Sequence, residues 1–164
     1  MKDKIIRSAL GLLPSNEISG LEEFRLKHIH HPGKDIPFHV TLMYQFYLPY
    51  EIDGEVEKKL SDIASTIQRF EFVAHPLSTF PTTCVLYMTP SPSGPFERIN
   101  DILNKVFPEF DNGKCGYPLY HMTIASDYDD EKIVVAEFIE TFGYKSLDMT
   151  AGSLVANCVS SSKT

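Results

Sequence analysis

The chain has 164 residues, of which 43% are hydrophobic and 23% are charged, the composition of an ordinary globular protein. At this length we expect one domain over residues 1–164, large enough to bury a core without the help of a metal or disulfide. The formal net charge is −7 and no cluster of Lys or Arg exists, which argues against binding of long duplex nucleic acid, and no apolar run is long enough to cross a membrane.

The cysteines and the N-terminal stretch predict where the protein works. Cys84, Cys115 and Cys158 are odd in number and widely spaced, so we expect reduced thiols and a cytoplasmic location rather than a disulfide framework or a zinc site. Residues 1–14 are partly apolar, but Arg7 interrupts them and no small-residue cleavage site follows. We therefore expect no export signal.

In chain order, the first half predicts strand, helix, strand, helix, strand. ALGLLPS at 9–15 is a short apolar run ended by Pro-Ser, which is typical of a strand and its turn. Apolar residues at helical spacing over 18–29 predict a helix, with Ser19 and Glu22 as a capping box. FHVTL at 38–42 alternates like a strand, and 71–80 is strand-like. The helix between these two strands is predicted by the stripe Ile52, Val56, Leu60, Ile63 and Ile67.

The second half predicts the same order. VLYMTPS at 85–91 is an apolar run ended by Pro-Ser, YHMTI at 120–124 repeats the alternation of FHVTL, and 145–158 is strand-like. The acidic run at 127–131 suits a helix N-terminus, where the dipole favours negative charge. The two helices are predicted by the stripes Phe96, Ile99, Leu103 and Val106, entered through Pro95, and Val135, Phe138, Ile139 and Phe142.

This repetition, at a period of roughly 80 residues, indicates a tandem duplication with too few copies for a solenoid. We predict an α+β fold that is bilobal, with two duplicated lobes that each hold an antiparallel sheet backed by helices. We expect pseudo-twofold symmetry around a central cleft, and, since no Gly/Ser linker separates the halves, lobes that share a core.

The repeated five-residue phrase carries the chemistry. On a strand, His39 and Thr41 point to one face and the apolar residues between them to the other, and the same holds for His121 and Thr123. Histidine titrates near neutral pH, so one imidazole can accept a proton while the other donates one. Threonine hydroxyls can donate hydrogen bonds to the oxygens of a phosphate. A single histidine on a strand is usually structural, and it is the duplicated setting that favours one shared site.

On these residues the sequence resembles the 2H phosphoesterases, in particular their 2′-5′ RNA ligase-like group. That superfamily is defined by two His–apolar–Thr/Ser–apolar tetrapeptides, here HVTL at 39–42 and HMTI at 121–124. The resemblance covers nearly the whole chain. It implies His39 and His121 as general acid and general base, Thr41 and Thr123 as phosphate-binding residues, and no metal or other cofactor.

Two departures accompany the resemblance. The first tetrapeptide is often followed by a Pro-Phe pair, but Gln45 stands where that proline would be, which leaves the histidines intact and alters one wall of the cleft. The resemblance also leads us to expect one further strand after 145–158 to complete the second lobe.

Other residues invite weaker interpretations. HIHH at 28–31 matches no standard zinc spacing and is better explained as a helix end, and the acidic run at 127–131 as a helix start. Tyr117 and Phe46 lie near the histidine strands and are candidates for stacking on a base, although most aromatic residues belong to the core.

The functional hypothesis is a metal-independent phosphodiesterase that opens a 2′,3′-cyclic phosphate or cleaves a related 2′-5′ or cyclic nucleotide bond. The alternatives are the reverse reaction, which joins RNA ends through a 2′-5′ linkage, and a non-catalytic module that binds nucleotides or RNA ends. In each case the expected partner is a nucleotide or RNA end bound by a monomer, with no membrane involved.

Overall fold

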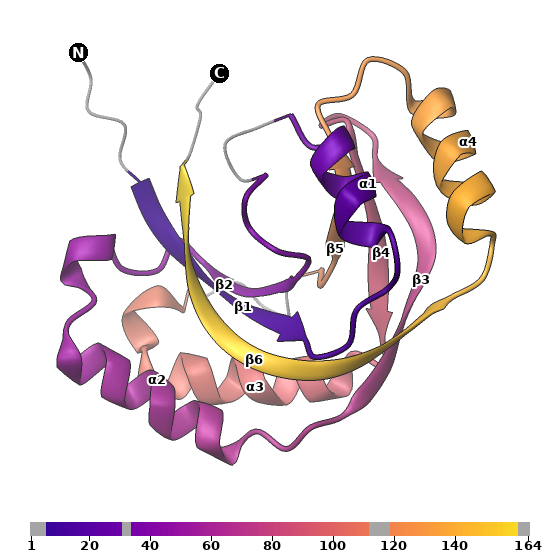
Figure 1. The fold of residues 1–164 in the computed structure, drawn as a ribbon. Coiled ribbons are helices and arrows are strands. Elements are labelled where there is room, and N and C mark those ends of the chain that lie inside the picture. The colour runs from indigo at the N-terminus through magenta and orange to yellow at the C-terminus, as the bar shows by residue number, and fades with distance from the viewer. Residues whose placement is uncertain (1–5, 31–33, 112–118, 161–164) are drawn as a thin grey trace, which may run out of the picture.

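The structure is a computed structural model that describes residues 6–30, 34–111 and 119–160. All the predicted helices and strands are present in the predicted order, together with two short 3-10 helices, η1 and η2 (Figure 1). The elements are β1 (Ile6–Pro14), α1 (Leu21–His28), β2 (Val40–Tyr44), η1 (Pro49–Glu51), α2 (Gly54–Thr66), β3 (Glu71–Phe80), β4 (Val85–Ser91), α3 (Gly94–Val106), η2 (Pro108–Phe110), β5 (Met122–Ser126), α4 (Glu131–Phe142) and β6 (Leu147–Ser160).

The fold is α+β, as predicted. The six strands form one sheet in the order β2-β1-β6-β3-β4-β5, and all neighbouring pairs are antiparallel. β6 is the longest strand, with 14 residues, and its long curve joins the two sides of the sheet (Figure 1). Its first part pairs with β3 and its later part pairs with β1. The further strand expected after 145–158 would fall beyond the described residues and stays a prediction.

The strand pairings repeat between the first half of the chain (β1 to β3) and the second half (β4 to β6). β1 pairs with β2 as β4 pairs with β5, whereas the last strand of each half pairs with the first strand of the other. The irregularities repeat as well, because the register shifts between Leu10 and Gly11 in β1 and between Leu86 and Tyr87 in β4. The two motif strands are therefore built into the sheet in the same way.

The ends of the two motif strands share an unusual backbone conformation. Gln45 follows β2 with φ 60°, and Asp127 follows β5 with φ 54°. The proline ring holds φ near −65°, so proline is incompatible with the conformation at position 45. Gln45 thus stands at a position whose backbone conformation in this structure excludes proline.

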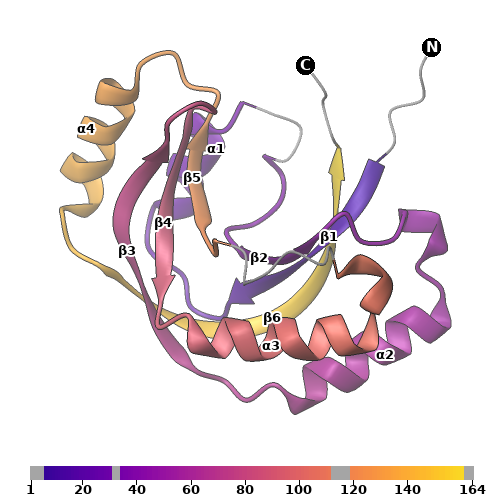
Figure 2. The ribbon, with the colours of Figure 1, turned by 180° about the vertical axis from the view of Figure 1, so that it is seen from behind.

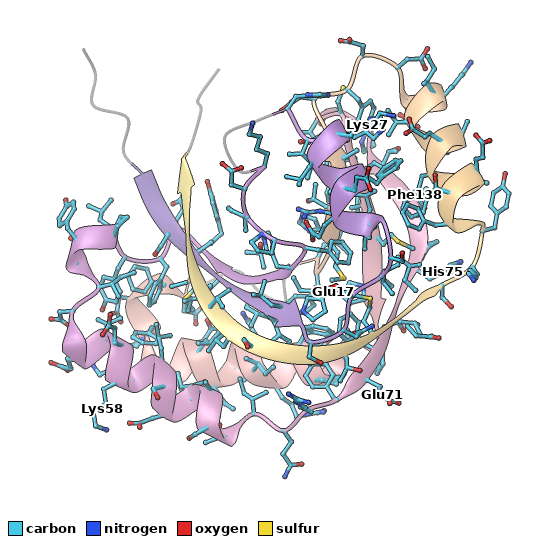
Figure 3. All side chains as sticks on the ribbon, viewed as in Figure 1. Glu17, Lys27, Lys58, Glu71, His75 and Phe138 are labelled. Carbon is cyan, nitrogen blue, oxygen red and sulfur yellow. The ribbon has the colours of Figure 1, made fainter. Side chains whose placement is uncertain are left out.

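The helices cover different parts of the sheet. α2 and α3 lie side by side below the curve of β1 and β6, whereas α1 and α4 lie beside β3, β4 and β5 (Figures 1 and 2). Phe138 of α4 points toward α1 and packs edge to face on Phe24 (Figure 3). Lys27 and His28 of α1 bond to Glu137 of α4 at 2.5 and 3.0 Å. These contacts hold the side of α1 that faces α4.

The helix starts differ from the prediction in one case. Asp130 caps α4 by accepting a hydrogen bond from the backbone N–H of Lys132, so the acidic run is a helix start as expected. The capping box at Ser19 and Glu22 is wrong: the N-cap of α1 is Gly20, which has φ 79° and makes no side-chain bond. The carboxylate of Glu22 does not turn back to its own helix start, because it bonds to two other groups near the first motif.

Among the residues that the structure describes, no helix combines the length and the apolar character that a bilayer crossing requires.

Candidate active site

The two motifs occupy equivalent places in the sheet. His39 immediately precedes β2 and His121 immediately precedes β5. Both histidines and both motif threonines, Thr41 and Thr123, are half-buried. The apolar residues between and after them are fully buried: Val40, Leu42, Met122 and Ile124. The alternation thus places both His–Thr pairs on the accessible face of their strands.

Each histidine ring is held by the carbonyl two residues before it. The Nδ1 of His39 lies 2.6 Å from the carbonyl oxygen of Pro37, and the Nδ1 of His121 lies 3.0 Å from that of Leu119. A carbonyl oxygen only accepts hydrogen bonds, so Nδ1 carries the proton in both rings. The other ring nitrogen, Nε2, is left to take or give a proton.

The two histidines lie close enough to interact electrostatically. Burial lowers the pKa of His39 below its usual value, and the positive charges of Arg25 and His121 lower it further, against the raising effects of the Pro37 carbonyl and Glu22. Hydrogen bonds also join the two motifs through α1, from Thr123 to Arg25, from Arg25 to Glu22 and from Glu22 to Phe38, so the structure brings together motifs that are about half the chain apart.

The surroundings of the two histidines differ. Gly11 pairs with Thr41 across β1 and β2, and a Cβ at Gly11 would lie only 3.2 Å from Cδ2 of His39, so the ring lies directly against β1. The equivalent partner of Thr123 is Tyr87 on β4.

Two aromatic rings adjoin the second histidine. Phe80 and Tyr87 stack with their ring centroids 4.2 Å apart, and both meet the ring of His121 edge-on, at 5.2 and 5.7 Å. Both rings are half-buried, so part of each ring faces solvent beside the histidine. They form an aromatic platform on one side of the candidate site only.

A buried cation lies between the motifs. Arg25 of α1, only 2% exposed, donates from Nε to the carbonyl oxygen of Thr123 at 2.9 Å and from a terminal nitrogen to Glu22 at 2.7 Å. The other carboxylate oxygen of Glu22 accepts a hydrogen bond from the backbone N–H of Phe38, next to His39, at 2.7 Å. Two side chains of α1 therefore link the first motif to the second.

Of the two aromatic residues predicted to stack on a base, one is buried and the other is not described by the structure. The role suggested for Phe46 is wrong, because its ring is 0% exposed and packs against Tyr47, Phe107 and Phe110. A ring without exposed surface cannot meet a base. Tyr117 lies outside the described residues.

The histidine-rich stretch is a helix end. His28 is the last residue of α1, buried and bonded to Glu137, and His30 is exposed, while position 31 lies outside the described residues. Across 6–30, 34–111 and 119–160, no group of three or more His, Cys, Asp or Glu side chains is placed to hold a metal ion.

Sequence reasoning missed four residues near the motifs: Glu22, Arg25, Phe80 and Tyr87. A signal for Arg25 existed, because it occupies a buried position of α1 together with Leu21, Phe24 and His28, at the spacing of an apolar stripe. A charge at such a position must be paired, and its partner was the glutamate three residues earlier. Nothing in the sequence marks the aromatic platform, because it depends on strand pairing.

The chain is similar to known proteins in sequence and in fold. The family model of the 2′-5′ RNA ligase superfamily matches residues 13–155. No curated protein matches the chain. Among solved structures, a crystal structure of a phosphoesterase has a TM-score of 0.51 at 13% identity, covering 93% of this chain and 95% of that one.

Two further solved structures are similar. The apo form of E. coli LigT has a TM-score of 0.51 at 13% identity, over 96% of this chain and 89% of that one. Kluyveromyces marxianus Usb1 has a TM-score of 0.50 at 14% identity, over 96% of both chains. At these identities the likeness shows a common fold.

Proposed function

Because the chain belongs to the 2′-5′ RNA ligase superfamily, we propose that it is a metal-independent phosphodiesterase that opens a 2′,3′-cyclic phosphate or cleaves a related 2′-5′ or cyclic nucleotide bond. One observation carries the proposal most directly. Both motif histidines are held through Nδ1 by a backbone carbonyl, and each lies beside a threonine on the accessible strand face. This is the arrangement that an acid–base pair needs, since Nε2 of each ring is available to substrate.

The reaction would use the two rings in opposite protonation states. A water oxygen forms a bond to phosphorus while the bond from phosphorus to one ribose oxygen breaks. The neutral imidazole takes the proton of the attacking water, and the protonated imidazole gives its proton to the departing ribose oxygen. The product is a phosphomonoester, and proton exchange with solvent restores both rings.

The threonines would stabilise the phosphate. Negative charge concentrates on the non-bridging oxygens as the water attacks, and the hydroxyls of Thr41 and Thr123 are short donors on the same strand faces as the histidines. We further propose that the two halves form lobes related by a pseudo-twofold axis, with the phosphate bound in a cleft on that axis. The repeated pairing of β1 with β2 and β4 with β5 supports this arrangement.

The aromatic platform would hold the base. Phe80 and Tyr87 are half-buried and adjoin His121. Any of the nucleobases can stack on the exposed part of an aromatic ring, because every base has a flat π-face. The glycine at the equivalent place beside His39 offers no such surface. We therefore place the nucleoside on the side of His121.

A direct test uses a panel of phosphodiesters and identifies the products. The full chain is incubated with a 2′,3′-cyclic mononucleotide, a 2′-5′ dinucleotide and a cyclic dinucleotide, each in EDTA, and the products are separated by chromatography. We expect a ring-opened or cleaved phosphomonoester from the wild type and none from His39→Ala/His121→Ala.

Each rival gives a different result. Activity that EDTA abolishes and added zinc or manganese restores would make the histidines metal ligands. Joining of RNA ends without hydrolysis would favour the ligase direction, which uses the same groups in reverse. Binding without turnover of any substrate would leave the non-catalytic module.

A further inference from the structure

Arg25 occupies a buried position where a charged side chain costs folding free energy. Its side chain is almost entirely removed from solvent, although it carries a charge, and burial lowers its pKa against the opposing effect of Glu22. A buried guanidinium is retained only where its donors are satisfied.

Each nitrogen of the guanidinium has a partner. Nε donates to the carbonyl oxygen of Thr123 at 2.9 Å, one terminal nitrogen bonds to Glu22 at 2.7 Å, and the other donates to the carbonyl oxygen of Ile36 at 3.3 Å. The guanidinium also lies over the ring of Phe38, with 5.5 Å between its central carbon and the ring centroid. A side chain so buried and so fully bonded does not reach a bound phosphate. Its effect must pass through the motifs that it holds.

A helix of the second half makes a similar bond to a motif strand, but with an uncharged side chain. There, Asn100 of α3 donates from its side-chain amide to the carbonyl oxygen of Leu42 at 2.7 Å, so a helix of the second half is bonded to the motif strand of the first. Arg25 does the same from the first half to the second. A cation makes one of these helix-to-strand bonds and a neutral amide makes the other, so the two halves place different charges beside their motifs.

The charges that face His39 come from two places. Arg25 and Glu22 lie on α1, and His121 lies before β5. After burial, which has the largest effect, Arg25 opposes a proton on His39 and Glu22 favours one. Within the setting made by burial and by the bond to the Pro37 carbonyl, these two side chains shift the pKa of His39 in opposite directions.

We infer that Arg25, held by Glu22, is a positioning residue that makes His39 the general base of the pair and leaves His121 as the acid, an assignment that rests on the proposed function. The charge of Arg25 adds to the effect of burial in disfavouring a proton on His39, and its bond to the carbonyl of Thr123 holds the second motif in place. Glu22 limits the effect of that charge and anchors the first motif through the N–H of Phe38.

The test compares variants whose effects have opposite signs. NMR titration of the histidine ring protons, assigned with His39→Gln and His121→Gln, reads each pKa in the full chain without substrate. Arg25→Met is expected to raise the pKa of His39, because the opposing cation is gone. Glu22→Gln is expected to lower it, because Arg25 keeps its charge without the carboxylate. The acid limb of the kcat/KM profile should move with each titration.

Two control variants distinguish the effect of the Arg25 charge from a general loss of packing around α1. Arg25→Lys keeps the charge, so the pKa of His39 should stay close to that of the wild type, while kcat falls by roughly tenfold because the second motif is held less well. Glu137→Gln removes the negative charge that pairs with Lys27 and His28 of α1 and should leave the titration of His39 unchanged.

Shifts of the same sign in Arg25→Met and Glu22→Gln, or no shift in either, would overturn the inference. If Arg25→Met does not fold, Glu22→Gln and Arg25→Lys decide the matter alone, through a lowered and an unchanged pKa of His39. A wild type that turns over no phosphodiester, while its variants titrate with opposite signs, would overturn the proposed function and leave the charge relation intact.

Discussion

The bond from Nδ1 to a backbone carbonyl gives His39 and His121 the same tautomer and the same free nitrogen. If the pair acts as acid and base, His39→Ala or His121→Ala should each lower the rate on the order of 10²–10⁴-fold. The double variant should be only slightly worse than the poorer single variant, because groups that act as a unit lose their function together. Turnover of a 2′,3′-cyclic nucleotide measures these losses. Near-full activity in His121→Ala would show that the second motif is only a remnant of the duplication.

The pH dependence should follow from the state of His39. As the base, it must be neutral, and its pKa lies below the ordinary histidine value of about 6.5 because burial and nearby positive charge disfavour the proton. The kcat/KM of the wild type should therefore persist below pH ~6.5 and fall only when acidification reaches the lowered pKa. A profile of kcat/KM between mildly acidic and neutral pH tests this, and an acid limb above the ordinary value would contradict it.

The aromatic platform predicts a loss that depends on the base. Phe80→Leu should raise KM for a nucleoside 2′,3′-cyclic phosphate by roughly tenfold, since stacking on an aromatic side chain contributes about 1–3 kcal/mol. Ribose 2′,3′-cyclic phosphate, which has no base to stack, serves as the matched control and should be turned over as before. Equal losses on both substrates would mean that Phe80 acts on the ring of His121 rather than on the base.

The bond between α3 and β2 is the clearest case of one buried group holding two elements. Asn100 is 5% exposed, and its amide satisfies the carbonyl of Leu42. Asn100→Ala should lower the free energy of unfolding by about 1–3 kcal/mol, because that carbonyl would stay buried without a partner. Urea unfolding measures the change. Asn104→Ala, which removes only a 3.4 Å contact to Asn100, should cost less, and an equal cost would indicate a general loss of helix packing.

The elements were predictable because their patterns are strong and local. The apolar stripes of α2 and α3 and the alternation of the motif strands depend only on spacing, so both helices and both strands appeared where they were expected. The pairing of β3 with β4 and of β6 with β1 was not predictable, because alternation shows which face a strand buries but not which strand lies beside it.

The candidate site could be predicted only in part. Repetition marked the two His–Thr pairs as candidates, but their neighbours in the structure could not be predicted. Glu22 had the pattern of a capping box, and only the structure shows that its carboxylate bonds to the N–H of Phe38 and to Arg25 instead. Phe46 was near a motif in sequence, but it turns into the core, as most aromatic residues of a small domain must.

β6 joins the two sides of the sheet by pairing with β1 and β3, so a substitution in its middle should affect stability. A Cβ at Gly152 would lie 2.9 Å from the carbonyl oxygen of Leu13 and from the backbone nitrogen of Ser15. Gly152→Ala should therefore lower the free energy of unfolding by on the order of 1–3 kcal/mol, since backbone atoms must move to admit a methyl group.

Thermal unfolding should remain a single transition in Gly152→Ala, because both sides of the sheet depend on this strand. The matched control is Gly54→Ala at the start of α2, where a Cβ would meet nothing within 4 Å. It should be neutral or slightly stabilising. Two separate transitions in the Gly152 variant would mean that the sides of the sheet fold independently.

The last strand of each half pairs with the first strand of the other half, β3 with β4 and β6 with β1. A single half would hold β1 and β2 as one ribbon but would leave its third strand without a partner inside the same copy. Two such copies would complete each other, each lending its last strand to the other's first, as protomers do in a domain-swapped homodimer. Such an ancestor would carry two identical histidines across a true dyad, with no distinction between acid and base. Fusion of two such copies into one gene would let each copy change alone, and the cation in α1 and the amide in α3 are differences of the kind that such freedom permits.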